Sequence, residues 1–359
     1  MRILDIARNM LERYQRYDIM ENYYGLLAYY GWAHCAVELE DERFLNKVIQ
    51  RLMAYPENLD KQPVFHFESY KCGGNGKAYL LYEDKIGRIT LPDDVRKKFS
   101  ADVEKYAELT LQAKVEEHGI VVGPWEDRPT TLWIDVVTCV TPFMLFAGLT
   151  LDNDKYVEFG CKQCLEMYKL FLDKSNGLLH QAKGFVKGKP DAISEDHWSR
   201  GNGWGYIGLA DIVANIPKTH PLYAEAEKDY IELTDALLNY QYDGVWKQEI
   251  TRKDTWDESS GTGLILYSLG EGIRNGILRD NKYKIAFGLG IKRMTEKFIS
   301  KEFAPLSSCP SCLCPGNGTI EDYITLRQPK NDEWHAYGSI VLALCSAYSN
   351  GITEMKFEV

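Results

Sequence analysis

The sequence lacks a long uninterrupted apolar segment. A bilayer requires about 20 consecutive apolar residues, and no apolar run in this chain reaches that length. Residues 1–14 place a charge every few positions, so this stretch predicts an amphipathic helix and not the core of a signal peptide. We therefore expect no membrane-spanning segment and no secretion signal.

Charge of one sign is never concentrated. The chain has 42 Lys and Arg residues against 52 Asp and Glu residues, which gives a net charge of −10 without a block of like charges. We therefore expect no nucleic-acid partner and no membrane partner. An acidic substrate would need a local basic pocket.

The number of cysteines is odd, so they cannot all pair within the chain. Several of the nine cysteines fall within apparent helices, as Cys35, Cys139 and Cys345 do. Such residues are typical of small buried hydrophobic positions in a reducing compartment, not of a disulfide framework. The expected location is the cytoplasm.

Alternating strand patterns and Pro-, Ser- or Gly-rich linkers are almost absent, whereas helical periodicity runs through the chain. A turn of the form Asn/Asp-Gly, two apolar residues, a polar residue and Gln recurs at 172–181 and 238–248, which indicates repeated helical hairpins. Apolar stripes of helical period predict about eleven helices, near 3–14, 23–38, 43–54, 101–114, 133–149, 154–172, 204–214, 222–240, 260–276, 282–299 and 334–349.

Helical hairpins repeated about six times would use up the chain, so we predict an all-α fold, an (α/α)6 barrel, formed by a single catalytic domain over residues 1–359. In such a toroid the longer loops gather at one end, and function is expected there. These loops are 55–76, 115–132, 183–203, 246–260 and 301–333.

A lone acid, Asp135, lies in an apolar stretch between Ile134 and Val136. Burial there should raise the pKa of its carboxyl group, as a general acid at neutral pH requires. A position near the start of a helix would instead favour the charged form. The alternative interpretation is an acid that is satisfied by a backbone or Arg partner.

The segment 194–204 concentrates acidic, imidazole, guanidinium and indole groups in one loop. An Arg side chain offers a planar fork for a carboxylate, and Trp faces are suited to sugar rings. The ordinary alternative is a helix amino terminus capped by Asn202 with a structural Arg–Asp pair. Overlapping its end, residues 203–208 match the dinucleotide pattern Gly-x-Gly-x-x-Gly, but no buried strand precedes them, so helix packing through small residues is the better interpretation.

Two further segments have possible chemical roles. Cys309, Cys312 and Cys314 have a spacing seen in metal sites, and His335 would supply a fourth ligand, although a surface turn also fits this segment. Residues 256–263 lead into a helix, for which Ser260 or Thr262 are plausible caps.

Taken together, these motifs resemble glycoside hydrolase family 105, the unsaturated rhamnogalacturonyl hydrolases and the related unsaturated glucuronyl hydrolases. The resemblance covers roughly residues 20–350. Its motifs, which occur in the family's order, are Trp133-x-Asp135, Gly177-Leu-Leu-His180, Trp198-x-Arg200-Gly-Asn-Gly-Trp204, Glu258-Ser-Ser-Gly-Thr262 and Asn331-Asp332-x-x-His335-x-x-Gly338.

The resemblance implies an (α/α)6 hydrolase that removes a 4,5-unsaturated uronic acid from the non-reducing end of oligosaccharides made by polysaccharide lyases. Asp135 takes the position of the catalytic acid, and one carboxyl group would protonate C4 and then activate the water that adds to C5. No metal and no organic cofactor is expected. The residues expected to bind the substrate are Trp133, His180, His197, Trp198, Arg200, Trp204, Glu258 and His335.

The chain departs from the family pattern at one position. A second Asp is usual shortly before an early helix, where this chain has Glu68, several residues early, and then a segment without Asp. Either Glu68 takes its place, or one acid suffices, or the substrate differs.

Two other classes of function remain open at this point. The first is a zinc-dependent peptide-modifying cyclase on a similar helical toroid, with the cysteines at 309–314 and His335 as ligands. The second is a non-catalytic carbohydrate-binding toroid.

Overall fold

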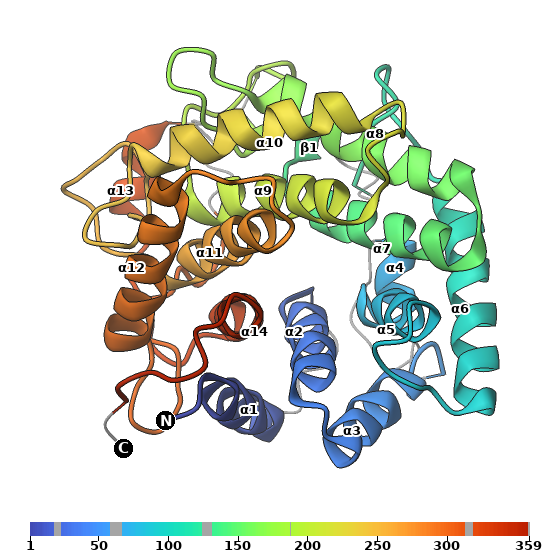
Figure 1. The fold of residues 1–359 in the computed structure, drawn as a ribbon. Coiled ribbons are helices and arrows are strands. Elements are labelled where there is room, and N and C mark those ends of the chain that lie inside the picture. The colour runs from blue at the N-terminus through green and yellow to red at the C-terminus, as the bar shows by residue number, and fades with distance from the viewer. Residues whose placement is uncertain (18–22, 58–66, 124–130, 187, 313–318, 358–359) are drawn as a thin grey trace.

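Two concentric rings of helices make up the fold in a computed structural model, which describes residues 1–17, 23–57, 67–123, 131–186, 188–312 and 319–357 (Figure 1). The inner ring consists of α2 (Tyr23–Leu39), α5 (Gly76–Lys85), α7 (Val136–Leu151), α9 (Ser199–Asn215), α11 (Ser259–Arg274) and α14 (Trp334–Ser349). The outer ring consists of α1 (Ile3–Tyr14), α3 (Glu42–Met53), α6 (Asp93–Leu111), α8 (Asp154–Phe171), α10 (Tyr223–Leu238) and α12 (Asn281–Phe298). The predicted (α/α)6 barrel is confirmed.

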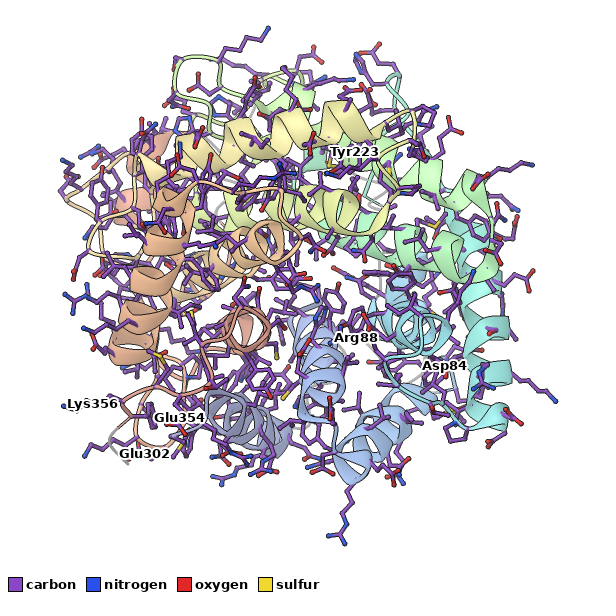
Figure 2. All side chains as sticks on the ribbon, viewed as in Figure 1. Asp84, Arg88, Tyr223, Glu302, Glu354 and Lys356 are labelled. Carbon is purple, nitrogen blue, oxygen red and sulfur yellow. The ribbon has the colours of Figure 1, made fainter. Side chains whose placement is uncertain are left out.

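The inner ring closes on itself. Each inner helix packs against the next, and the last, α14, packs against the first, α2. The two ends of the chain therefore meet, and the amino group of Met1 donates to the carbonyl oxygen of Met355 at 2.8 Å. Between α2 and α5, Arg88 bridges Glu38 at 2.7 Å and Glu83 at 3.1 Å, and side chains occupy the space between the rings (Figure 2).

The inner and outer helices differ in composition because they differ in burial. Inner helices such as α7 and α14 are buried on nearly all sides and are apolar all round, whereas the outer helix α3 buries one stripe of four residues. Side-chain caps begin several outer helices. Asp41 accepts from the backbone N–H groups of Arg43 and Phe44 before α3, and Asn153 accepts from Lys155 before α8.

Small residues let the inner helices approach closely. A Cβ atom on Gly338 of α14 would lie 2.6 Å from backbone atoms of Leu27 in α2, and one on Gly203 of α9 would lie 2.7 Å from the Cβ atom of Leu264 in α11. The pattern at 203–208 therefore serves helix packing, as we expected from the sequence.

Loops that are distant in sequence are tied together by short bridges. The strand β1 (Leu132–Trp133) pairs antiparallel with β2 (Ala182–Lys183), and Trp198 pairs with Glu249. The backbone N–H of Ser259 donates to the carbonyl oxygen of Ser307 at 3.0 Å. These bridges bring the starts of α7, α9 and α11 to the loops that the sequence assigned to function.

Helix positions were predicted well, with several corrections. The helix expected at 101–114 begins at Asp93, and the one expected at 204–214 begins at Ser199. Three helices were missed, namely α4 (Glu68–Lys71), α5 and α13 (Ile320–Thr325), together with the 3-10 helix Gln15–Tyr17. Helix α5 is short and buried on nearly all sides, so it shows no apolar stripe. Among the described residues, no helix is both long and apolar enough to cross a bilayer.

Candidate active site

Asp135 stands at the amino-terminal cap of α7, directly after β1. Its side chain accepts no capping hydrogen bond, and its Oδ2 atom is buried without a hydrogen-bond partner among the described residues. Burial raises the pKa of this carboxyl group to about 6, against the opposing effect of the Arg200 guanidinium. The carboxyl group therefore carries a proton over an appreciable part of the range near neutral pH.

Two polar side chains face Asp135 across the adjoining loop and helix. The backbone N–H of Ile134 donates to the carbonyl oxygen of Gln181 at 2.9 Å, which holds Gln181 beside the acid. The amide of Gln181 and the indole N–H of Trp204 both act to lower the pKa of Asp135. Neither forms a hydrogen bond of ordinary geometry within the described chain. Both side chains are thus turned toward the Asp135 carboxyl group.

Arg200 contributes a fully buried guanidinium from the first turn of α9. Its Nη1 atom donates to Ser260 Oγ at 2.9 Å and to the carbonyl oxygen of Cys309 at 2.7 Å. Its Cζ atom lies 4.3 Å from the centre of the Trp198 ring. The Nε and Nη2 atoms have no partner among the residues that the structure places. A buried cation with two such donors is a preformed anion site.

Glu258 fixes the surroundings of Arg200. Its carboxylate caps α11 by accepting from the backbone N–H groups of Ser260 and Gly261, and it also accepts from Ser199 Oγ at 3.1 Å and the Cys309 N–H at 2.9 Å. The expected cap at Ser260 or Thr262 is wrong, because α11 begins at Ser259 and Glu258 therefore occupies the cap position. The predicted contact of Glu258 with substrate stays a prediction.

A tyrosine–histidine–glutamate chain lies on the other side of Arg200. Tyr23 Oη is hydrogen-bonded to His335 Nε2, and His335 Nδ1 lies 2.6 Å from Glu333 Oε2. Burial and the nearby Arg200 lower the pKa of His335 to about 4, so its imidazole is neutral at pH 7. Burial raises the pKa of Tyr23, which lies within the electrostatic reach of both Arg200 and Asp135.

The residue suggested as a second acid, Glu68, pairs with Lys71 at 2.5 Å. The side chain of α4 that approaches Asp135 is instead Tyr70, whose Oη lies 2.7 Å from Cys139 Sγ. Burial raises the pKa of Tyr70, and the neighbouring Cys139 and Asp135 act in the same direction. The described surroundings of Asp135 therefore contain phenols and a guanidinium.

The remaining indoles differ in exposure. Trp198 is buried beneath Arg200 and donates from Nε1 to Gln248 at 3.2 Å. Trp133 is half-buried and stacks on Phe185, with ring centres 4.7 Å apart. Trp204 is buried beside Asp135.

His180 and His197 face a third residue, Asp173, which the sequence reasoning did not single out. His197 Nε2 lies 3.0 Å and His180 Nε2 4.0 Å from Asp173 Oδ2. His180 and His197 immediately precede Gln181 and Trp198, so their cluster lies beside the Asp135 site in the chain.

The cysteine segment does not form a metal cluster among the residues that the structure describes. Cys309 Sγ donates to the carbonyl oxygen of Ser311 at 3.0 Å, and Gln248 Nε2 donates to that sulfur at 3.2 Å. Cys314 lies outside the described residues.

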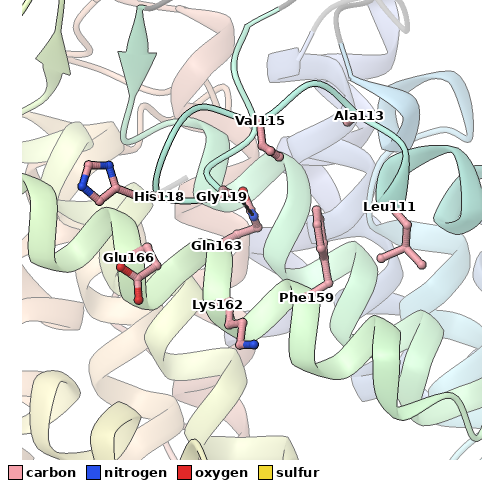
Figure 3. A pocket seen from close by; sticks show the side chains of 9 residues that line it. All are labelled: Leu111, Ala113, Val115, His118, Gly119, Phe159, Lys162, Gln163 and Glu166. Atoms are coloured by element: carbon pink, nitrogen blue, oxygen red, sulfur yellow. Dashed lines mark hydrogen bonds between the residues drawn. The ribbon is translucent and has the colours of Figure 1, made fainter.

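A surface groove of about 350 Å³ lies between the end of α6, the turn at 115–119 and α8 (Figure 3). Gln163 spans it by donating to the carbonyl oxygen of Gly119 and accepting from the N–H of Val121. The groove contains none of the predicted site residues, and the Asp135 site remains the candidate active site.

Sequence reasoning missed Gln181, Tyr23 and Tyr70 as neighbours of Asp135. Gln181 follows His180 directly, and its place in the recurring turn was the available signal. No local pattern marked the tyrosines, because α2 is rich in Tyr throughout.

A family model described as Glycosyl Hydrolase Family 88 matches residues 3–350. An unsaturated 3S-rhamnoglycuronyl hydrolase of Formosa agariphila is 29% identical over 163 residues, which are 43% of this chain and 43% of that protein. The chain thus spans less than half the length of that relative. An unsaturated rhamnogalacturonyl hydrolase of Bacillus subtilis is 22% identical over 277 residues, 75% of each chain.

The solved structures agree on the fold. A glycoside hydrolase of C. acetobutylicum from family 105 superposes with a TM-score of 0.75 and 19% identity, covering 95% of this chain and 99% of that one. The resemblance seen in the sequence motifs is confirmed.

Proposed function

The chain belongs to glycosyl hydrolase family 88, and from this premise we propose that it is an unsaturated uronyl hydrolase. It removes a 4,5-unsaturated uronic acid from the non-reducing end of oligosaccharides that polysaccharide lyases generate. Relatives that act on rhamnoglycuronyl and rhamnogalacturonyl substrates support this substrate class.

The observation that carries the proposal is the state of Asp135. A carboxyl group with a pKa of about 6, one buried oxygen and no capping hydrogen bond is suited to donate a proton near neutral pH. Around it lie the side chains of Gln181 and Trp204 and the Arg200 guanidinium, whose Nε and Nη2 atoms have no partner among the described residues.

The substrate ring is a vinyl ether, so its double bond is the reactive group. Asp135 delivers its proton to C4, and the positive charge that develops is shared between C5 and the ring oxygen. The Asp135 carboxylate then takes a proton from a water molecule as that water adds to C5. The resulting hemiketal opens by breaking the bond between C5 and the ring oxygen, and the hemiacetal left at C1 releases the aglycone.

Arg200 supplies the anion site for the uronate carboxylate through Nε and Nη2. Trp204 and Trp133 line the space for the sugar ring, and His335 adds a neutral imidazole to the lining of the site. Glu258 and Trp198 act through Arg200. The Trp198 ring packs against the guanidinium, and Glu258 accepts hydrogen bonds from Ser199 and from Cys309, whose carbonyl oxygen binds Arg200. Substrate contact by His180 and His197 stays a prediction.

The remaining parts of the proposal concern organisation and location. We propose that residues 1–359 act as one catalytic domain, since one core cluster includes residues from both rings. The eight described cysteines are free, and seven are buried, which supports a reducing cytoplasmic location. Neither nucleic acid nor a membrane is proposed as a partner. The zinc cyclase and the non-catalytic toroid are not favoured.

The test is a panel of lyase-generated unsaturated disaccharides, beginning with uronyl-rhamnose compounds, followed by loss of the double-bond absorbance. In heavy water the product should carry one deuterium at C4. Saturated counterparts of the same disaccharides serve as controls. Cleavage of the saturated compounds at a similar rate, or failure to consume any unsaturated one, would contradict the proposal.

A further inference from the structure

Three side chains from two separate loops converge next to the active-site segment. Asp173 follows α8, His180 precedes β2 and His197 precedes α9. One ligand atom from each, a carboxylate oxygen and two imidazole nitrogens, lie within 4.8 Å of one another. His197 is buried, whereas the side chains of His180 and Asp173 expose 19% and 22% of their surfaces. The cluster is thus enclosed on one side and open to solvent on the other.

Both imidazoles present Nε2 to Asp173, and each has an oxygen atom of the protein behind its Nδ1 atom. His180 Nδ1 lies 3.2 Å from the carbonyl oxygen of Asp196, so Nδ1 carries the proton and Nε2 presents a lone pair. His197 Nδ1 lies 3.6 Å from Glu249 Oε1. Imidazole ligands of metal ions typically have such a backbone carbonyl or carboxylate behind them.

Glu249 is itself held in place. It is fully buried, its Oε2 atom accepts from the backbone N–H of His197 at 2.8 Å, and its Oε1 atom accepts from Thr251 Oγ1 at 2.9 Å. The carboxylate therefore has a fixed orientation toward the His197 ring.

Asp173 is also positioned by its surroundings. The backbone N–H of Ser175 donates to its Oδ1 atom at 2.8 Å, which leaves Oδ2 directed toward the imidazoles. Asn176 Nδ2 donates to Oδ2 at 3.0 Å and lies 3.1 Å from His197 Nε2. His197 Nε2 lies at hydrogen-bond distance, 3.0 Å, from Asp173 Oδ2, so a cation at this point would replace the Nε2 proton and displace the amide, while Asn176 Oδ1 keeps its bond to the Leu178 N–H at 2.8 Å.

His180 Nε2 and Asp173 Oδ2 are two acceptors that face each other at 4.0 Å. No proton of His180 lies between them in the tautomer that Asp196 selects, so the arrangement favours a cation there. Two imidazoles and one carboxylate suit a first-row divalent ion, with Zn²⁺ bonds of about 2.0–2.2 Å and a fourth position for solvent. The partly exposed His180 side chain is the member of the cluster that would have to move toward the ion.

We propose that Asp173, His180 and His197 form a binding site for a divalent transition-metal ion, with Zn²⁺ as the ion that fits best. The site joins the turn that leads to Gln181 with the loop that leads to Trp198 and Arg200. Metal binding would therefore fasten together the two segments that carry the anion site. This second statement rests on the proposed hydrolase function, whereas metal binding itself does not.

The experiment uses the full chain after dialysis against a chelator, titrated with ZnCl₂ in a calorimeter, with bound metal measured by elemental analysis. One zinc per chain is expected, together with a rise in Tm. Loss of a residue behind a metal ligand weakens metal binding by about 10–100-fold, so we expect an effect in that range for Glu249→Gln. Asp173→Asn and His180→Gln remove ligands themselves and should weaken zinc binding by more. Circular dichroism and the metal-free Tm show whether each variant folds.

Two controls separate this site from adventitious binding. His118 belongs to an exposed cluster with Glu116 and Glu117, so His118→Gln should leave stoichiometry and affinity unchanged. Cys312→Ser should do the same. Stoichiometric zinc that survives both Asp173→Asn and His180→Gln, or that is lost in either control, would overturn the proposal, as would the absence of zinc binding. Because no substrate is present, neither result bears on whether the chain hydrolyses unsaturated uronides.

Discussion

Trp198 supports Arg200 from below, with the guanidinium carbon 4.3 Å from the centre of the indole ring and both side chains buried. The indole face offers the cation a favourable electrostatic surface and fixes the plane of its fork. Ser260 and the carbonyl oxygen of Cys309 hold one end of that fork, whereas the other two nitrogen atoms have no partner among the described residues. The orientation of the guanidinium is thus set by its protein contacts.

The first prediction concerns this fork. Arg200→Lys keeps the charge but loses the planar donor pair, so kcat/KM for an unsaturated disaccharide should fall by about 10–100-fold, mainly through KM. Arg252, which pairs with Asp254 in an exposed turn, provides the matched control. Arg252→Lys should leave the kinetics unchanged, and equal losses in the two variants would argue against a specific role for Arg200.

The second prediction is a pH dependence. Asp135 must be protonated to donate a proton to C4, and its pKa is raised to about 6. We therefore expect kcat/KM to decline as pH rises through about 6. Well above pH 6, the decline in kcat/KM should approach about tenfold per pH unit. Initial rates between pH 4 and pH 9 at constant ionic strength provide the check. A profile that stays flat up to pH 8 would be inconsistent with Asp135 as the acid.

The third prediction concerns stability. A raised folded-state pKa means that the charged form of Asp135 is disfavoured in the fold, so wild-type stability falls as pH rises from about 4 through about 6. The difference in free energy of unfolding, Asp135→Asn minus wild type, should therefore increase by roughly 2–3 kcal/mol between pH 3.5 and pH 8. Urea unfolding at both pH values measures this, and a constant difference would show that the carboxyl group is not desolvated.

The fourth prediction tests the closure of the inner ring. A Cβ atom on Gly338 would meet backbone atoms of Leu27 at 2.6 Å, so Gly338→Ala should destabilise the fold by about 1–3 kcal/mol. Gly288 lies in the outer helix α12 with nothing within 4 Å of such an atom, and Gly288→Ala should instead stabilise by about 0.5–1 kcal/mol. Thermal unfolding of the two variants compares them, and equal shifts would contradict the packing of α14 against α2.

The fold was largely predictable because outer helices leave a strong periodic signal. The inner ring was harder, since helices such as α5 are buried on nearly all sides and their sequences lose the polar face that marks a helix. The start of α9 was placed at Trp204 for a related reason, because the Gly-rich segment from Ser199 disfavours a helix locally and is accepted through its tertiary contacts.

The candidate site was predictable where one residue carries the chemistry. The apolar neighbours of Asp135 indicated a raised pKa, and the structure agrees in direction. The partners of that acid were not predictable, because Gln181, Tyr23 and Tyr70 reach it through tertiary contacts between separate helices and loops. The approach of His180 and His197 to Asp173 likewise depends on the geometry of the two loops on either side of β2.

The central claim is that Asp135 is the proton donor, and the direct measurement is the turnover of an unsaturated disaccharide by Asp135→Asn, which removes the acidic proton and keeps the shape. Asp254→Asn, a change at an exposed carboxylate, is the matched control. We expect Asp135→Asn to lose about 10²–10⁴-fold in kcat with its fold intact while the control retains wild-type activity. Near-normal turnover by a folded Asp135→Asn protein would contradict it.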